Sequence, residues 1–347
     1  MINTLRKIRN LVQLKMIRLC RKTGFTSDLY YAFFSKEFRR EHQSVLQGKY
    51  KHLIEVRGNK GNIYQLVRNI HRIEKGLLMV PRRPVFAIGY IEETIDLFSI
   101  ELKNQRSDDS QLTWFHDVLT EYFSSCDSHD IVDKQYKRFS QLLDNYGHKK
   151  LKKTQKFPYV RETKNSSGIS YEEFYQLNRQ RRSTRWFLDK PVPRDLIDKA
   201  ILAANQSPSA CNRQPFEYII VDDKKLLSQV VNVPMGTKGY ADNLPVMIVV
   251  VGNLDAYFSE RDRHLIYIDA SLANMTLMLA LETLGLSSCP INWPDIERKE
   301  IEMADLLGLE KHQRPVMCIG LGYPDPEKKV AYSEKKPINN LRKYNLG

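Results

Sequence analysis

The chain has 347 residues, of which 42% are hydrophobic, so it can build the packed cores of two domains and is not a disordered protein. Its five cysteines contain no CxxC pair, which argues against a disulfide framework or a zinc site and predicts a reducing compartment such as the cytoplasm. The formal net charge is +13, and residues 1–60 alone hold 14 Lys and Arg against four acids. This asymmetry favours either contact with an anionic surface or a solvated face on a helical domain.

Residues 1–22 are predicted to form a basic amphipathic helix that contains no acidic residue. The uninterrupted apolar core of a secretory signal is absent, and no uninterrupted apolar run approaches the ~20 residues that span a bilayer. The helix is expected either to pack onto the domain behind it or to make peripheral contact with an anionic membrane. Nucleic acid is not an expected partner, because no nucleic-acid-binding motif is present.

The rest of the amino-terminal half is predicted to be helical, because apolar residues recur at spacings of three and four without strand alternation. These helices are expected over residues 27–46, 63–77, 90–102 and 131–146. A polar tract begins at Gly147 and predicts a linker over 151–169. The sequence therefore divides into an all-α basic domain over 1–150, the linker, and a second domain over 170–347.

One helical segment of the amino-terminal domain concentrates ionisable residues. It reads HRIEKGLLMVPRRP from His71 to Pro84 and includes Arg72, Glu74 and Lys75. As a functional site, it would receive an acidic substrate or a nucleotide phosphate. As a structural element, it is a helix surface on which Glu74 pairs with a neighbouring cation. The sequence leaves both interpretations open.

The second domain mixes predicted helices and strands. Helices are expected over 171–178, 196–204, 264–286 and 301–307, and strands over 218–221, 245–251 and 315–320. The run at 245–251 is continuous and β-branched, which is typical of a strand buried on both faces. An α+β fold follows for this domain, with the long apolar helix at 264–286 in a core or a subunit interface.

Two polar loops of this domain are the candidate site. The first reads RRSTR and places the guanidinium groups of Arg181, Arg182 and Arg185 beside two hydroxyls, an arrangement that binds phosphate. The second reads SPSACNRQPF and is dense in amide and hydroxyl groups between two prolines. The chain has no GxGxxG, Walker, GxSxG or HExxH motif and no predicted metal site, so redox chemistry would need a bound cofactor.

These two loops, together with DASLANMTLMLALETLGLSSCPI and LLGLEKHQRPVMCIGLGYPD further along, resemble the nitroreductase family of FMN-dependent oxidoreductases. The resemblance covers about half of the chain and implies an antiparallel sheet wrapped by helices. It also implies a homodimer with FMN at the subunit interface. NAD(P)H would then donate two electrons, and an organic acceptor would take them in the same slot by a ping-pong mechanism.

The resemblance further implies a role for each site residue. Arg181, Arg182 and Ser183 are expected to bind the phosphate and ribityl chain of FMN. Arg185 is expected beside the pyrimidine edge, where a guanidinium stabilises the negative charge of reduced flavin. The polar loop of the second subunit is expected to contribute Ser207, Pro208, Ser209, Asn212 and Gln214.

Two later segments complete the implied site. Pro290, Ile291 and Asn292 match the segment whose backbone amide donates to flavin N5, and Lys335 and Lys336 match a second pair of phosphate-binding cations. Asn292, Trp293 and Arg185 are the residues expected to take part in catalysis. The chain departs from the family pattern at Trp293-Pro294, where an indole is expected to narrow the space above the flavin or to re-aim the N5 amide.

Two alternatives to a general NAD(P)H oxidoreductase follow from the same residues. The first is a specialised flavin enzyme of a biosynthetic pathway, such as a desaturase or a reductive dehalogenase. The second is a non-catalytic protein that binds an anionic surface and keeps the flavin fold as a structural element.

Overall fold

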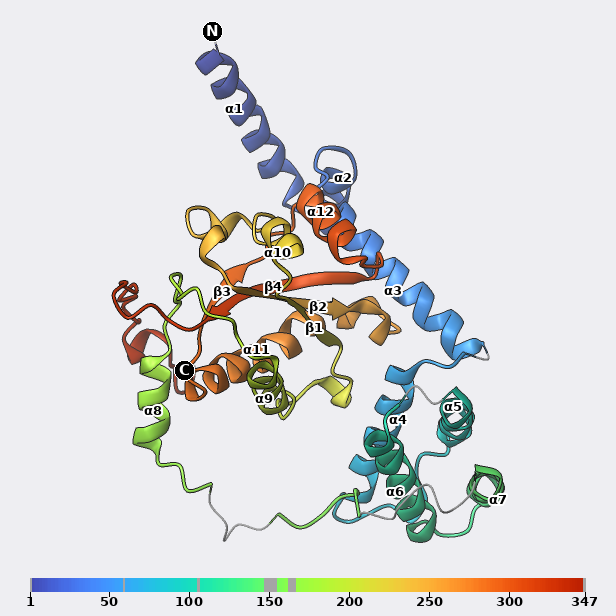
Figure 1. The fold of residues 1–347 in the computed structure, drawn as a ribbon. Helices are drawn as coiled ribbons and strands as arrows, with labels where there is room; N and C mark the ends of the chain where they lie inside the picture. Colours follow the sequence, from blue (N-terminus) through green and yellow to red (C-terminus); the bar gives the residue numbers. More distant parts are fainter. Residues whose placement is uncertain (1, 59, 105–106, 147–154, 162–166, 346–347) are drawn as a thin grey trace.

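The computed structural model describes residues 2–58, 60–104, 107–146, 155–161 and 167–345 (Figure 1). The strands are β1 (Phe216–Val221), β2 (Val246–Asn253), β3 (Ser287–Asn292) and β4 (Gln313–Gly322). The helices of the amino-terminal half are α1 (Ile2–Cys20), α2 (Gly24–Phe33), α3 (Arg39–Arg57), α4 (Ile63–Leu77), α5 (Ile91–Asn104), α6 (Asp109–Ser125) and α7 (Asp130–Tyr146). Those of the second half are α8 (Tyr171–Gln180), α9 (Arg194–Ala204), α10 (Lys224–Val230), α11 (Leu265–Thr283) and α12 (Glu297–Leu307). The predicted α+β fold with a helical amino-terminal half is confirmed.

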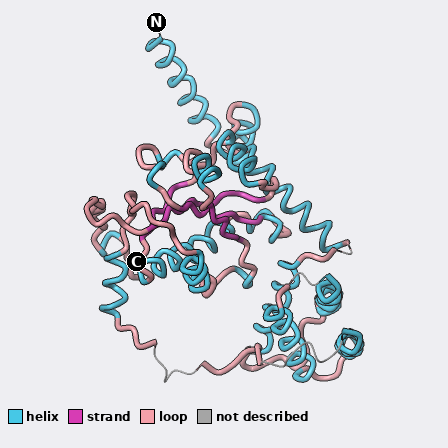
Figure 2. The backbone as a smooth tube through the Cα atoms, in the orientation of Figure 1, coloured by secondary structure: helices cyan, strands magenta, loops and turns pink. Residues whose placement is uncertain are grey.

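The strands form one antiparallel sheet in the order β1-β2-β4-β3. Every residue of β2 is buried, which confirms the strand predicted at 245–251 and its burial on both faces. Met247, Val249 and Val251 point to a core shared with α10 and α12. Ile248 and Val250 point to a second core shared with α9 and α11. The sheet is therefore the middle layer between two layers of helices (Figure 2).

The long helix α11 has two different apolar sides. One side, including Ala270, Ala273 and Leu277, is fully buried under the sheet. The other leaves Ile268 and Leu272 about half exposed, at 53% and 47%. Within the described ranges, the segment Glu260–Thr283 is the one helix long and apolar enough to cross a membrane, but 44% of it is buried inside the protein. Its buried side identifies it as a core helix of the domain.

The amino-terminal helices form three groups, which are α1 with α2, α3 alone, and α4 to α7. Helices α4 to α7 share a core of their own, separate from the two cores of the sheet (Figure 1). Helix α3 instead packs against the turn Leu254–Ala256 after β2. Gly48 permits this close approach, because a Cβ atom there would lie 2.6 Å from the backbone of Leu254. The ring of His52 donates its Nδ1–H to the carbonyl oxygen of Asp255 at 2.8 Å.

Several predicted elements need correction. The single helix predicted at 27–46 is wrong: the chain breaks at residues 34–38 between α2 and α3, and the hydroxyl of Thr23 caps the start of α2. Helices α6 and α10 and strand β3 are not among the predicted elements. The boundary expected near residue 150 and most of the linker lie in 147–154 and 162–166, outside the described residues.

The expectation that the first helix packs onto the domain behind it is also wrong. Helix α1 projects from the body and contacts α2 (Figure 1). Its apolar residues are 40–64% exposed, and they include Ile8, Leu11, Val12, Leu14, Ile17 and Leu19.

Candidate functional site

The arginine loop, residues 181–185, follows α8 and lies against the sheet. Ser183 forms a parallel β-bridge with Ser288 at the start of β3. The backbone N–H of Thr184 donates to the carbonyl oxygen of Ser288 at 3.0 Å. A second bridge joins Phe187 to Pro324 after β4. The loop is therefore fixed to the ends of two strands that are more than 100 residues away in sequence.

The side chains of this loop present unused donors. The Nε of Arg181 and the hydroxyl oxygen of Ser288 are buried and have no hydrogen-bond partner. Arg182 and Arg185 donate to the neighbouring carbonyl oxygens of Arg181 and Ser183, at 3.1 and 3.3 Å. Among the described residues, no carboxylate lies within 4.0 Å of any of these three guanidinium groups. Guanidinium groups that have no carboxylate partner at the edge of the sheet are suited to bind an anion, such as the phosphate of a nucleotide-type cofactor.

Tyr240 and Cys289 lie beside Arg185, and neither is among the predicted site residues. The guanidinium carbon of Arg185 lies 5.8 Å from the centre of the Tyr240 ring, and the Tyr240 hydroxyl lies 3.9 Å from the Cys289 sulfur. Burial raises the pKa of Tyr240 to about 12, and burial also raises the pKa of the Cys289 thiol. Both groups therefore stay protonated at neutral pH, and Cys289 is a packed thiol, not a nucleophile.

The polar loop, residues 207–214, is shaped by its own side chains and by α11. The hydroxyl of Ser209 accepts from the backbone N–H of Gln214 at 3.1 Å, and the Gln214 amide donates to Asn212 at 3.3 Å. Cys211, Asn212 and Gln214 all have positive φ, at 56°, 54° and 49°. Non-glycine residues in this region carry backbone strain and are often found at functional sites.

Neighbouring elements hold this loop in place. The backbone N–H of Ala210 donates to the buried carboxylate of Asp269 on α11 at 2.9 Å, and Ser207 bonds Thr276 on the same helix at 3.0 Å. Helix α4 of the amino-terminal half packs against residues 210–212 from outside. Within the described ranges, no hydrogen bond or ion pair joins the polar loop to the arginine loop.

The predicted N5 segment ends β3. Pro290 is half-buried, Ile291 is buried and Asn292 is exposed. Trp293 is only 8% exposed, and its indole donates to the carboxylate of Glu300 at 2.5 Å. The expectation that this indole narrows the space above a flavin is wrong, because the ring packs inside the core shared with α10 and α12.

The remaining predicted residues lie elsewhere. Lys335 and Lys336 are exposed on the segment after β4, and neither side chain has a hydrogen bond or an ion pair among the described residues. In the ranges that the structure covers, no group of three or more His, Cys, Asp or Glu forms a metal site. The five cysteines are all free.

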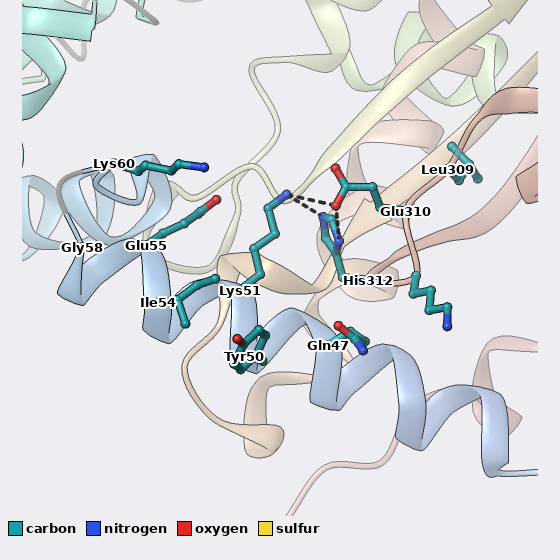
Figure 3. Close-up of a pocket in the computed structure, with 11 residues that line it drawn as sticks. Gln47, Tyr50, Lys51, Ile54, Glu55, Gly58, Lys60, Leu309, Glu310 and His312 are labelled. Carbon is teal, nitrogen blue, oxygen red and sulfur yellow. Dashed lines mark hydrogen bonds and ion pairs between the residues drawn. The ribbon is translucent and has the colours of Figure 1, made fainter.

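A separate cleft of about 790 Å³ lies between α3 and the segment before β4 (Figure 3). Lys51 donates to His312 Nε2 at 3.1 Å and pairs with Asp255 at 3.1 Å, and Glu310 lies 3.3 Å from His312 Nδ1. Burial lowers the pKa of His312, so the ring is neutral at pH 7 and accepts from the lysine. These contacts join α3 to the second domain.

The second half of the chain is thus a sheet-and-helix domain with a loop of cationic donors at the edge of its sheet. Comparison with known proteins gives the family. The profile of the nitroreductase family matches residues 179–238 and 229–323. Residues 179–323 of the chain therefore match the nitroreductase family.

Individual relatives have different activities in their names. Human iodotyrosine deiodinase 1 is 25% identical over 201 residues, which cover 49% of this chain and 68% of that protein. A putative NADH dehydrogenase/NAD(P)H nitroreductase of Methanothermobacter thermautotrophicus is 29% identical over 157 residues, which cover 45% and 80%. A solved FMN-dependent nitroreductase from Clostridium difficile is 26% identical with a TM-score of 0.42, covering 49% of this chain and 98% of its own.

Proposed function

We propose that this chain is an FMN-dependent oxidoreductase that takes two electrons from NAD(P)H and passes them to an organic acceptor by a ping-pong mechanism. The observation that carries the proposal is the pair of buried, unpartnered donors at Arg181 Nε and the Ser288 hydroxyl. A buried donor without a partner costs about 1–3 kcal/mol, and a bound phosphate or ribityl oxygen removes that cost. Bound FMN would supply reversible two-electron chemistry.

The residues of the chain bind and tune that cofactor. Arg181, Arg182 and Ser183 hold its phosphate and ribityl chain. Arg185 lies at the pyrimidine edge, where its fixed charge stabilises the reduced form. Tyr240, kept protonated by burial, limits the movement of the Arg185 guanidinium beside it. The backbone of Pro290–Asn292 faces the reacting side.

A homodimer completes this proposed site. Ile169, Phe174, Leu272 and Met275 are 38–64% exposed on the adjoining faces of α8 and α11 and line one open apolar cleft. A second copy would bury this face. The polar loop 207–214 of that copy would then approach the flavin held by the arginine loop.

Reductive dehalogenation is a second candidate, favoured by the similarity to human iodotyrosine deiodinase 1 over 201 residues. In such a reaction, two electrons and one proton replace a carbon–halogen bond with a carbon–hydrogen bond and release halide. The same arginine loop and flavin would serve this reaction. Comparing steady-state turnover of nitroaromatic and halogenated phenolic acceptors, with halide release measured directly, distinguishes the two candidates.

The deciding experiment is the colour and cofactor content of the purified protein. We expect a yellow protein that releases one FMN per chain on denaturation, identified by mass spectrometry. A colourless protein that takes up no added FMN would refute the enzyme function. Light scattering of the same sample, expected to give twice the mass of one chain, tests the dimer.

A further inference from the structure

Three arginines meet where α4 packs against the polar loop. Arg68 and Arg72 lie one turn apart on α4, and Arg213 belongs to the loop. The guanidinium carbon of Arg68 lies 5.0 Å from the ring centre of Phe258, and that of Arg213 lies 5.1 Å from the ring centre of the adjacent Tyr257. Aromatic faces therefore hold these two cations side by side.

Arg213 is the most buried of the three. It is only 6% exposed, and its Nε is buried without a hydrogen-bond partner. The nearest ion-pair contact is to Asp262, at 4.0 Å, which is the outer limit of an ion pair. A guanidinium has five N–H donors, and a buried one normally uses most of them. Arg213 donates none of its side-chain N–H groups within the part of the chain that the structure describes.

The two arginines of α4 also have unused donors. Arg72 stacks on Tyr90, with 3.6 Å from its guanidinium carbon to the ring centre, and donates once, to Asn69 at 3.3 Å. Across the described ranges, Arg68 has no side-chain hydrogen bond and no ion pair. Burial lowers the pKa of Arg68, and the neighbouring charges of Arg72 and Arg213 lower it further. The fold thus holds like charges together, which costs free energy unless an anion lies among them.

Two acidic residues near α4 already have hydrogen-bond partners. The carboxylate of Glu93 accepts from Gln65 and Asn69, at 2.9 and 2.7 Å. Glu74 accepts from the indole of Trp114 at 2.8 Å and lies 3.1 Å from His71. Within the His71–Pro84 segment, Glu74 therefore pairs with structural partners, as one of the two interpretations expected. Arg72 has no ion pair with a carboxylate among the described residues.

We propose that Arg68, Arg72 and Arg213 form an oxyanion site that binds a carboxylate or phosphate group of a substrate. One part of this proposal, that the anion belongs to a substrate, rests on the proposed function, because the polar loop lies beside a flavin only if the chain is a flavoenzyme. The amino-terminal helical half then contributes directly to substrate recognition. Guanidinium groups suit this role, since their planar donors match both carboxylate and phosphate oxygens.

Phosphate titration of the purified, FMN-loaded protein tests the site independently of turnover. The test variant is Arg68→Gln/Arg72→Gln, which leaves the buried Arg213 in place. The matched control is Arg39→Gln/Arg57→Gln, which removes the same charge from exposed positions of α3. Calorimetry should give a phosphate Kd that is at least about tenfold higher for the test variant and unchanged for the control. The reason is that the loss of one charge-assisted hydrogen bond lowers affinity by more than about tenfold. An unchanged Kd in the test variant would overturn the proposal.

Kinetics then identify the source of the anionic group. With NADH as donor, the ratio of kcat/KM for 4-nitrobenzoate to that for 4-nitrobenzyl alcohol should fall about tenfold in the test variant, through KM, if the acceptor carries the anion. If instead kcat/KM falls for NADPH but not for NADH, the site binds the 2′-phosphate of the electron donor. If neither ratio changes, the site binds no substrate and the proposal fails. If the purified protein takes up no flavin, the phosphate titration can still be carried out on it. Failure of the proposed function is therefore distinguished from failure of this anion site.

Discussion

The backbone N–H of Thr184 donates to the carbonyl oxygen of Ser288 at 3.0 Å, and this bond fixes the arginine loop to the first residues of β3. Because the loop is anchored through its backbone, its side chains are free to bind a ligand. Arg181 turns a buried, unpartnered Nε inward, whereas Arg185 is exposed and lies over Tyr240. The two arginines therefore have different surroundings and should have different roles.

Replacing Arg181 and Arg185 separately should produce distinct defects. Arg181→Ala should weaken FMN retention by about 1.5–3 kcal/mol, the usual contribution of a hydrogen bond to a charged group. Arg185→Ala should retain FMN but lower its reduction potential, because the reduced anion loses its cationic partner. Equilibrium dialysis and dye-coupled redox titration measure the two effects.

Arg179→Ala is the matched control for both measurements, since Arg179 is an exposed arginine on α8, just before the loop. It should leave retention and potential unchanged. Equal potentials in the native protein and Arg185→Ala would contradict the role assigned to Arg185.

Local patterns were sufficient to predict much of the second domain. The β-branched run at 245–251 has a single plausible structure, a strand buried on both faces, and β2 is that strand. The arginine and polar loops were also recognisable, because their residue types are unusual at such density. The alternation of β2 side chains between the two helical layers follows directly from strand geometry.

Contacts between distant segments were not predictable from the same patterns. Ser288 belongs to the site only because β3 begins beside a loop about 100 residues earlier. Arg68 and Arg213 are far apart in sequence, and only the packing of α4 on the polar loop brings their charges together. The position of the Trp293 indole depended on Glu300, an acceptor seven residues away on the next helix.

That buried acceptor gives a prediction about stability. Glu300 is 1% exposed and bonds the Trp293 indole, while Arg314, also 1% exposed, lies 3.4 Å away. Glu300→Ala removes one partner of a buried ion pair and leaves the indole N–H unpaired, so it should lower the free energy of unfolding by about 3–5 kcal/mol. Urea titration followed by tryptophan fluorescence measures the change.

Glu302→Ala provides the comparison on the same helix. Glu302 contacts only Lys299, at 3.2 Å, in an exposed pair of the kind that contributes about 1 kcal/mol or less. Similar losses of stability for the two variants would mean that the Glu300 network does not stabilise the domain.

Helix α1 carries the remaining prediction, which concerns an anionic membrane. The segment from Arg6 to Lys22 has seven Lys and Arg and no acid. Its leucines at 11, 14 and 19 are about 60% exposed, and Phe25 and Phe33 of α2 are 72% and 75% exposed. A cation near an anionic bilayer contributes about 1 kcal/mol, and the exposed apolar groups add insertion between the headgroups.

We therefore expect the full-length protein to sediment with vesicles containing phosphatidylserine, but not with neutral vesicles, and to be released by salt. Lys15→Glu/Arg18→Glu should abolish sedimentation, because it reverses two of the seven positive charges between Arg6 and Lys22. Lys328→Glu/Lys329→Glu makes the same charge change at exposed positions after β4 and should bind like the native protein. Absence of binding at low salt would refute membrane contact, and equal loss in both variants would mean that net charge alone, and not α1, drives the association.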